Sequence, residues 1–564
     1  MRLFDTSFGA LYCRIFTIFV YKAKLLTLKK RMKSLKLLIS LVLALASSCA
    51  LAVNPYLPLW EFTPDGEPYV FEDPDRPGHY RVYVYGSHDL EKTMYCGRDL
   101  VVWSASVDSL DAWRYDGVIF TSRRDRDGRW LYPDSVGDVL YAPDVAVRRE
   151  ADGRTAYYLY PNNQAWGRQG MVAKSYRPDG PFEVCNWSET NPAETDGVLR
   201  FDPAVFVDDD GRVYGYWGFK QSFGAELDPA TMATVKPGCQ IVENMIPSCE
   251  QDKEFRFFEA SSMRKIKDKY VLIYSRVTND GEWGLPSTNY TLAYAYSTSP
   301  LGPFTYGGTI IDGRGKELLP GGNMRATATF FGNTHGSIAQ INDQWYVFYH
   351  RQADTTEFSR QAMVAPVQVS VTEGAQGKVY ISEAEYTSEG FDIDGLDPLG
   401  VYPAGIACYY TNPEPMSQEY PSVIYPGSHT RAVRSAYSGH GDPYSFEINK
   451  CPMVNNTDGS VVGYKYFNFS KTKGLRRLSL RLAYIPEGVD GTVDIFIESP
   501  DAKKGRKVAS LDLKAGEQPV ERTVSLPVSH LSRIEGKHPL FFVFQSAEKG
   551  RSLCTICTLG FTAE

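Results

Sequence analysis

The chain has 564 residues, a formal net charge of −7 and an aromatic content of 13%, with 37 Tyr and 9 Trp. This length exceeds what one compact core usually holds and predicts two or three domains. An acidic balance, with no basic stripe interleaved with aromatics, excludes a nucleic-acid partner. The aromatic residues have two explanations that composition leaves open: they stack on sugar faces, or they are strand formers of an all-β protein.

Residues 1–52 are predicted to be a targeting segment. The stretch Met32–Ala52 has a Lys-bearing start, an apolar run and a closing Ala-Leu-Ala sequence, which is typical of a secretory signal. We therefore expect a secreted or periplasmic protein. The alternative is a cell-surface lipoprotein, because the sequence ASSC that ends at Cys49 resembles a lipoprotein box. No later apolar stretch is long enough to predict a membrane span in the mature chain.

Five segments repeat one design between Pro68 and Arg351. Each is a short β-type run, a polar corner with Gly, Asp or Lys, and a second run rich in Tyr, Val and Phe, which is a β-hairpin. The segments are GEPYVFEDPDRPGHYRVYVYGSHD, APDVAVRREADGRTAYYLYP, DPAVFVDDDGRVYGYWG, EASSMRKIKDKYVLIYS and HGSIAQINDQWYVFYHR. Five such hairpins, with further strand-like text between them, predict a five-bladed β-propeller over residues 53–385.

An acid or a histidine stands at or just ahead of the inner strand of each predicted blade. In a propeller these positions converge on one axis although they are far apart in sequence. They are Asp65, Glu67, Asp144, Asp202, Glu259 and His335. Gathering carboxylates costs repulsion and desolvation, so their recurrence favours a functional site. The alternative for any one of them is a cap of a hairpin turn.

The C-terminal part changes character after a linker predicted at 386–398, where Gly, Pro and Asp cluster. Residues 399–564 contain short runs that alternate apolar and polar residues, separated by turn signals. This pattern predicts an antiparallel, jelly-roll-like β-sandwich, so the whole mature chain is expected to be all-β. The ten cysteines have no spacing typical of a zinc site and predict free thiols.

Two carboxylates that face each other across a pocket suit the cleavage of a glycosidic bond. One protonates the leaving oxygen while the other activates water or attacks the sugar. A further carboxylate nearby raises the pKa of the acid, so that it stays protonated near neutral pH. This chemistry needs no metal or redox cofactor.

The sequence resembles glycoside hydrolase family 43 over about Asn54 to Arg351. The residues that carry the resemblance are NPYLPLWEFTPDGEPYVF, RVYVYGSHD, LYAPDVAV, RFDPAVFVDDDGRVYGYWG, FFEASSM and GNTHGSIAQINDQWYVFYHR. The resemblance implies a five-bladed propeller and an inverting hydrolase of arabinose- or xylose-containing polysaccharides, with galactans as substrates in some branches. One departure is local: the chain has EAS where many members have EGP.

Carried over by position, the resemblance implies four catalytic candidates. Glu259 matches the general acid, and Asp144 matches the carboxylate that tunes the pKa of that acid. The general base is either Asp65, which has the usual side chain, or Glu67, which has the usual register before Pro68. Both alternatives stay open at this point.

Six further residues are candidates for substrate binding, and no metal ligand is assigned. They are Asp202, Trp166, Trp283, Arg325, His335 and Arg351. The resemblance implies that His335 lies on the channel axis, where relatives hold a water or a calcium ion, so a calcium ion near it is the one cofactor considered. The two Arg are alternatively structural ion-pair partners, and the two Trp alternatively pack in the core or rim.

The C-terminal domain resembles a family-6-like carbohydrate-binding module through DGSVVGYKYFNF, GVDGTVDIFIESP and HPLFFVFQS. No Trp follows Trp345, so Tyr464 and Tyr466 would have to supply the aromatic platform, and a structural appendage is the alternative.

These observations together predict a secreted glycosidase that releases a pentose, in the first place α-L-arabinofuranose, from plant-type polysaccharide by single displacement with inversion. A β-xylosidase or an exo-galactanase of the same fold is an alternative. A non-catalytic glycan-binding propeller is another, from a different functional class.

Overall fold

The computed structural model describes residues 52–90, 94–329, 332–354, 356–413, 430–433, 450–475, 477–528 and 531–563. The predicted targeting segment lies outside them apart from Ala52. No helix in this described part of the chain is long and apolar enough to cross a membrane.

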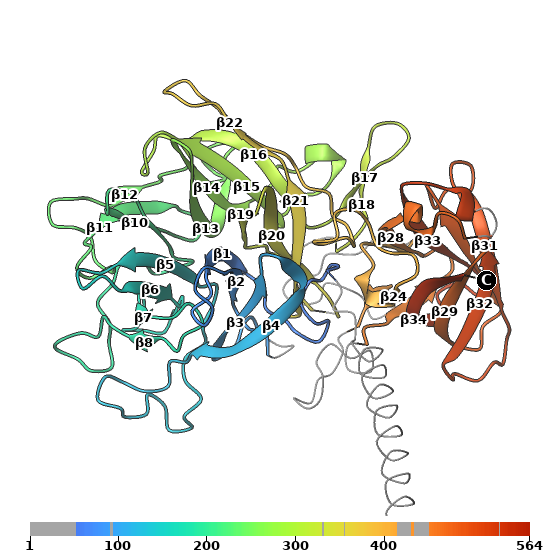
Figure 1. Ribbon diagram of the computed structural model, residues 1–564, viewed down its shortest axis with the longest axis horizontal. Coiled ribbons are helices and arrows are strands. Elements are labelled where there is room, and N and C mark those ends of the chain that lie inside the picture. The colour runs from blue at the N-terminus through green and yellow to red at the C-terminus, as the bar shows by residue number, and fades with distance from the viewer. Residues whose placement is uncertain are drawn as a thin grey trace, which may run out of the picture. The chain divides into compact units, whose positions relative to one another are not determined.

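The first two blades are four-stranded antiparallel sheets (Figure 1). The strands of the first are β1 (Glu67–Glu72), β2 (Tyr80–Gly86), β3 (Leu100–Ser106) and β4 (Ser109–Phe120). Those of the second are β5 (Asp144–Arg149), β6 (Thr155–Tyr160), β7 (Ala173–Ser175) and β8 (Glu183–Val184). Each blade begins with a predicted hairpin, so β1 pairs with β2 and β5 pairs with β6.

The third and fourth blades repeat this order, and the fifth is a three-stranded sheet. The third contains β9 (Ala204–Val207), β10 (Val213–Trp217), β11 (Phe223–Leu227) and β12 (Val242–Glu243). The fourth contains β13 (Phe257–Ile266), β14 (Lys269–Arg276), β15 (Thr291–Ser297) and β16 (Thr305–Asp312). The fifth contains β19 (Ser337–Ile341), β20 (Gln344–Gln352) and β21 (Arg360–Val367). The N-terminal segment lies against β21, because the amide of Asn54 exchanges two hydrogen bonds with the backbone of Val364 (2.6 and 2.9 Å).

The blades pack face to face through the second strand of each. Leu159 of β6 belongs to the core shared with the first blade, and its neighbour Tyr160 belongs to the core shared with the third. Alternate side chains of a strand point to opposite faces, which explains why these strands read as nearly continuous apolar runs. Each fully buried side chain of this size contributes about 1.5–3 kcal/mol to folding. The predicted five-bladed propeller is confirmed.

The first strands of the blades neighbour one another around the axis: β1 contacts β19, β5 contacts β9, and β9 contacts β13. This arrangement brings the leading ends of strands from five separate hairpins together. Smaller elements lie outside the blades. They are the hairpin of β17 (Lys316–Leu318) and β18 (Met324–Ala326), the hairpin of β22 (Val369–Val371) and β23 (Val379–Ile381), and the short 3-10 helix η1 (Glu282–Gly284).

The C-terminal domain is an antiparallel β-sandwich of two sheets, as predicted, coloured orange to red in Figure 1. One sheet contains β24 (Val401–Pro403), β26 (Arg431–Ala432), β27 (Met453–Thr457), β29 (Leu478–Pro486), β32 (Arg522–Val528) and β34 (Ser552–Ala563). The other contains β25 (Tyr409–Thr411), β28 (Val461–Asn468), β30 (Gly491–Ile497), β31 (Arg506–Leu513) and β33 (Lys537–Gln545). Three 3-10 turns accompany them: η2 (Ala404–Ile406), η3 (Phe469–Thr472) and η4 (Leu531–Arg533).

The predicted linker is a packed segment rather than an exposed one. Phe391 is buried, and its ring contacts those of Tyr56, Trp113 and Tyr346 at centroid distances of 5.5, 5.8 and 5.1 Å. The segment therefore contributes to the core of the protein. All eight cysteines that the structure describes are free thiols.

Candidate active site

A pocket of about 500 Å³ contains most of the acids predicted to converge. Its acidic and basic lining residues are Asp65, Asp202, Glu259, Glu357, His335 and Arg360. Aromatic side chains form part of the wall, where the ring of Phe219 packs on those of Phe201 and Phe258 at 5.0 and 5.1 Å. An apolar wall with a few convergent polar groups is typical of a small-molecule site.

Asp65 lies in the loop ahead of β1 and is held by a cation. Its carboxylate accepts hydrogen bonds from Nη1 of Arg360 (2.9 Å) and from the hydroxyl of Ser87. Its backbone N–H donates to Nδ1 of His350 (3.3 Å). Burial acts to raise the pKa of Asp65, but Arg360, together with smaller contributions from two nearby histidines and the hydroxyl of Ser87, outweighs it and lowers the pKa below its usual value. Asp65 is therefore an ionised carboxylate at neutral pH.

Glu259 is half-buried near the start of β13. Its pKa is shifted in the direction opposite to that of Asp65. Burial raises its pKa well above the usual value, and the negative charges of Asp202 and Asp65 raise it further. Its carboxyl group has no hydrogen-bond partner among the described residues. Glu259 is thus a protonated acid that faces the pocket with its oxygens uncommitted.

Asp202 connects the acid to the rest of the pocket. It accepts hydrogen bonds from Nδ2 of Asn162 (2.7 Å) and from the backbone N–H of Ala260 (3.1 Å), the residue after Glu259. Burial and the charge of Asp65 raise its pKa to about 7. Asp65 and Asp202 have φ angles of 59° and 43°, in the left-handed region. Strained backbone of this kind often marks a functional site.

Glu67 and Asp144 do not line this pocket; they belong to a buried polar network of the channel. Glu67 pairs with Arg264 (2.8 Å), while Asp144 accepts from the hydroxyl of Tyr69 (2.6 Å) and the backbone N–H of Val205 (2.7 Å). Both oxygens of Asp144 are therefore occupied. Among the described residues, the carboxylates that raise the pKa of Glu259 are Asp202 and Asp65, and Asp144, expected to have this effect, is not one of them.

His335 lies between the pocket and this network. Its Nδ1 is 3.7 Å from Oδ2 of Asp202, and its Nε2 is 4.0 Å from Oε1 of Glu67. Burial lowers its pKa to about 4, so the ring is neutral. No group of three or more His, Cys, Asp or Glu in the described part of the chain could hold a metal ion. Calcium takes about six to eight oxygen ligands, and near His335 two side-chain oxygens, Oε1 of Glu67 and Oδ1 of Asn333, are buried without a hydrogen bond. A calcium ion near His335 stays a prediction.

The four other predicted substrate-binding residues lie outside the pocket wall. Trp166 is 89% exposed on the loop between β6 and β7. Lys316 covers the ring of Trp283 at 3.6 Å. Arg325 binds Glu317 (2.6 Å), and Arg351 is buried, with Nε donating to the amide oxygen of Gln361 (3.0 Å). Both Arg therefore have the structural partners that the sequence left as their alternative.

Sequence reasoning missed Arg360 and its second partner Asp89. Nε and Nη2 of Arg360 donate to the two oxygens of Asp89 (2.9 and 2.8 Å), which orients the cation toward Asp65. It also missed Glu357, whose carboxyl forms a hydrogen bond with the hydroxyl of Tyr95 at the pocket wall. The available signal was an acid three residues before β21 and a cation at its first residue, at the last strand of a blade rather than the first.

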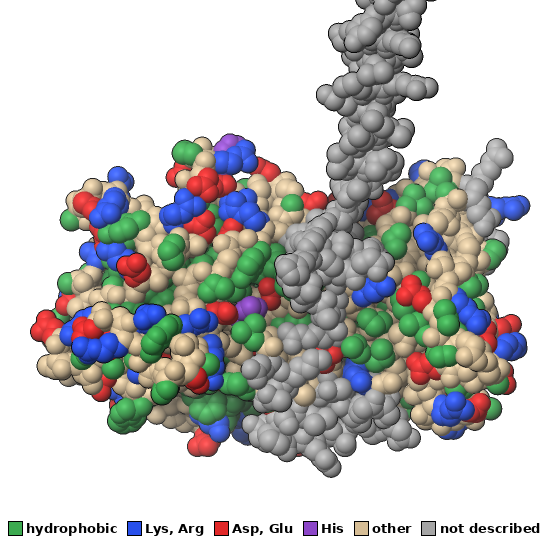
Figure 2. Space-filling model, turned by 90° about the horizontal axis from the view of Figure 1, so that it is seen from below, with side chains coloured by type: hydrophobic (Ala, Val, Ile, Leu, Met, Phe, Trp, Pro, Cys, Tyr) green, Lys and Arg blue, Asp and Glu red, His purple; other side chains and the backbone are tan. Residues whose placement is uncertain are grey.

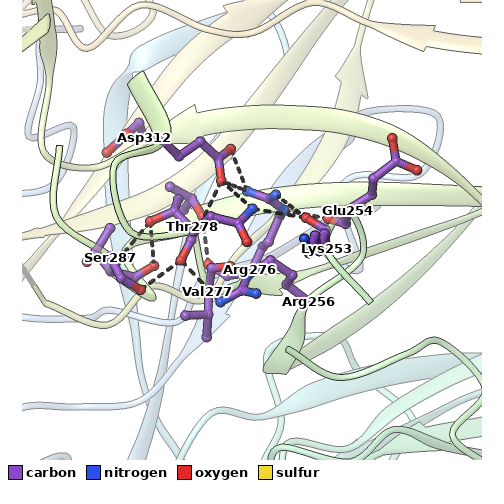
Figure 3. Close-up of polar contacts among 12 residues, drawn as sticks. Lys253, Glu254, Arg256, Arg276, Val277, Thr278, Ser287 and Asp312 are labelled. Carbon is purple, nitrogen blue, oxygen red and sulfur yellow. Dashed lines mark hydrogen bonds and ion pairs between the residues drawn. The ribbon is translucent and has the colours of Figure 1, made fainter. Parts of the chain in front are cut away.

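One wall of the pocket is a loop fixed by its backbone carbonyls (Figure 3). Nε of Arg256 donates to the carbonyl of Val277 (2.6 Å), and the hydroxyl of Ser287 donates to the carbonyl of Thr278 (2.7 Å). Nε of Arg276 donates to the carbonyl of Glu254 (2.7 Å). These contacts hold Val277 and Ser287 in the pocket wall.

The sequence model described as glycosyl hydrolases family 43 matches residues 72–372. A xylosidase/arabinosidase of Thermoclostridium stercorarium is 31% identical over 527 residues, covering 90% of this chain and 98% of that protein. An arabinoxylan arabinofuranohydrolase of Bacillus subtilis (strain 168) is 24% identical over 502 residues, covering 83% and 86%. The crystal structure of a family 43 arabinoxylan arabinofuranohydrolase from Bacillus subtilis, in complex with cellotetraose, is 21% identical, with a TM-score of 0.42 and coverage of 91% and 98%.

Proposed function

Because the chain belongs to glycosyl hydrolase family 43, and is therefore a glycosidase that hydrolyses O-glycosyl bonds, we propose that it removes α-L-arabinofuranosyl branches from arabinoxylan by single displacement with inversion. Relatives that align over most of both chains are named for action on arabinosides or on arabinoxylan. The neutral, hydroxyl-rich substrate suits a pocket that combines aromatic rings with carboxylates.

The proposed reaction gives a role to three of the four pocket carboxyl groups. Glu259 gives its proton to the glycosidic oxygen as the bond from that oxygen to the anomeric carbon breaks. A water attacks the opposite face of the anomeric carbon and passes a proton to Asp65. Each event balances: Glu259 ends ionised, Asp65 ends protonated, and solvent restores both. Asp202 keeps Glu259 protonated before the reaction.

The observation that carries this proposal is the opposite direction of two pKa shifts in one pocket. The pKa of Asp65 is lowered through Arg360, whereas burial and two neighbouring carboxylates raise the pKa of Glu259. Pairs of titratable groups whose surroundings push their pKa values apart are the acid and base of many active sites. The same contrast supports Asp65 rather than Glu67 as the base, because burial raises the pKa of Glu67 to about 7.

The anomeric form of the first product tests the proposal. With nitrophenyl α-L-arabinofuranoside as substrate, the free arabinose is expected to appear first as the β-anomer, observed by proton NMR before mutarotation. First release of the α-anomer would mean retention and a covalent intermediate, which contradicts single displacement. No release of arabinose at all would contradict the substrate.

Replacing Asp202 with Asn is expected to move the basic limb of the pH profile downward. The charge of Asp202 raises the pKa of Glu259, so its removal lets Glu259 lose its proton at lower pH. The measurement is kcat/KM of nitrophenyl arabinofuranoside as a function of pH. Asp144→Asn is the control and should leave the limb in place. A basic limb that moves in Asp144→Asn but not in Asp202→Asn would mean that Asp144, not Asp202, raises the pKa of the acid.

A β-D-xylosidase activity of the same pocket is the second candidate. It is favoured by the relative from Thermoclostridium stercorarium, which is named for both activities and aligns over 98% of its length. Nitrophenyl β-xyloside measured beside the arabinofuranoside distinguishes the two, because the better substrate has the higher kcat/KM.

We also propose that the protein acts outside the cytoplasm, on the basis of the signal-like stretch Met32–Ala52. Polysaccharide is found there, and side chains of both charge signs are interspersed on the face seen in Figure 2, as expected for a neutral partner. Processing between Ala52 and Val53, read by N-terminal sequencing of the exported protein, distinguishes a secreted form from one lipidated at Cys49.

A further inference from the structure

Trp166 presents an aromatic face that nothing in the described part of the chain covers. Its side chain is 89% exposed and has no ring or cation contact among the described residues. Two other partly exposed tryptophans differ in this respect: Arg124 covers Trp130 at 3.6 Å, and Lys316 covers Trp283 at 3.6 Å. The indole of Trp166 is therefore open to a ligand.

The loop that carries Trp166 is held in place on both sides of the ring. The carboxylate of Asp138, itself buried, accepts from Nδ2 of Asn163 (2.7 Å) and from Nε and Nη2 of Arg168 (2.6 and 2.8 Å). Within the loop, Oδ1 of Asn163 accepts from the backbone N–H of Ala165 (2.9 Å), and the carbonyl of Ala165 accepts from the N–H of Arg168 (3.0 Å). A platform fixed in this way loses little conformational freedom when a ligand binds.

The same loop reaches the catalytic pocket. Gln164 lines the pocket, and Asn162 donates to Asp202 (2.7 Å). Trp166 follows Gln164 by two residues, and two residues span at most about 7 Å between Cα atoms. Trp166 therefore stands beside the pocket rather than on a distant surface. A ligand that lies on its ring can thus extend into the pocket.

We propose that Trp166 is a stacking platform for the main chain of the polysaccharide whose branch is cleaved in the pocket; this rests on the proposed function. The xylopyranose units of such a main chain have hydroxyls at their edges and C–H groups on their faces, which pack against an indole. A contact outside the pocket, with sugar units that do not react, is the same in the ground state and the transition state. It therefore acts on KM for the polymer and leaves kcat unchanged.

The experiment compares Trp166→Ala with Trp130→Ala, using soluble arabinoxylan and nitrophenyl arabinofuranoside. For Trp166→Ala, KM for arabinoxylan is expected to rise about five- to tenfold, with kcat unchanged. Both constants for the small glycoside should stay as in the unsubstituted protein, because that substrate does not reach the platform. Trp130→Ala removes an indole whose face is already covered and should change neither substrate.

Each other outcome contradicts a specific statement. An unchanged KM of Trp166→Ala for arabinoxylan overturns the platform. An equal rise in KM for both substrates also overturns it, because Trp166 would then act inside the pocket. An unsubstituted protein that releases arabinose from neither substrate contradicts the proposed function, and the platform for that main chain is then overturned with it.

Discussion

Replacing Glu259 with Gln is expected to lower kcat by about 10²- to 10⁴-fold on substrates whose leaving group is a sugar. The amide keeps the shape of the side chain but has no proton to give to the glycosidic oxygen. Binding should be retained, because a protonated carboxyl and an amide are similar in size and both neutral. The measurement is kcat for release of arabinose from an arabinosylated xylo-oligosaccharide.

The leaving group provides the control. Dinitrophenolate departs without protonation, so the loss on dinitrophenyl arabinofuranoside should be far smaller than the loss on the oligosaccharide. Equal losses on both substrates would mean that the substitution damages the pocket in general. A kcat that stays within a few-fold on both would remove Glu259 from the role of acid.

The propeller could be predicted because each of its hairpins is recognisable from a short, local sequence pattern. Hairpins such as Tyr69–Tyr85 of β1 and β2 combine β-forming residues with a polar corner, and five repeats of one hairpin leave few arrangements other than a ring. The sandwich followed from the same period-2 alternation. Packing of the segment at 386–398 was not predictable in this way. Its polar and Gly-rich sequence is typical of a linker, whereas the burial of Phe391 depends on Tyr56 and Tyr346, far away in the chain.

The acids could be predicted as a group but not sorted into pocket and channel. Glu67 and Asp144 are the first residues of β1 and β5, so they share the fixed orientation of those strands. Asp65 and Asp202 stand two residues before β1 and β9, in left-handed backbone. Glu259 is inside β13, at a register shift that interrupts the pairing with β14. These backbone irregularities have no signal in the sequence, and they separate the acids of the pocket from those of the channel network.

The partners of the base could not be predicted, because they come from the other end of the propeller sequence. Arg360 lies 295 residues after Asp65 and 271 residues after Asp89. The sequence shows an acid and a cation at β21, but it contains no signal that pairs Arg360 with these two carboxylates. The same holds for Trp166, whose exposure depends on how Asp138 holds the loop.

Replacing Arg360 with Met is expected to lower both stability and activity, for one electrostatic reason. Asp65 and Asp89 are buried, and the guanidinium is the cation that both bind. Without it each of these buried carboxylates loses a hydrogen-bonded charge partner, which costs about 3–5 kcal/mol of unfolding free energy. Burial then determines the titration of Asp65, so its pKa rises instead of falling. The acid limb of kcat/KM should move to higher pH, because more alkaline conditions are needed to ionise the base.

Arg351→Met is the matched control for this prediction, because Arg351 is equally buried but its hydrogen-bond acceptors include the amide of Gln361 and the carbonyl of Ala407 (2.8 Å), which are neutral. Denaturant unfolding should show a loss of stability for both variants, whereas only Arg360→Met should shift the acid limb of kcat/KM. If the acid limb does not move in Arg360→Met, the protonation of the base does not depend on this cation. Asp65, which the cation binds, is then not the base. An equal shift in both variants would mean that the limb reports unfolding rather than the protonation of one carboxylate.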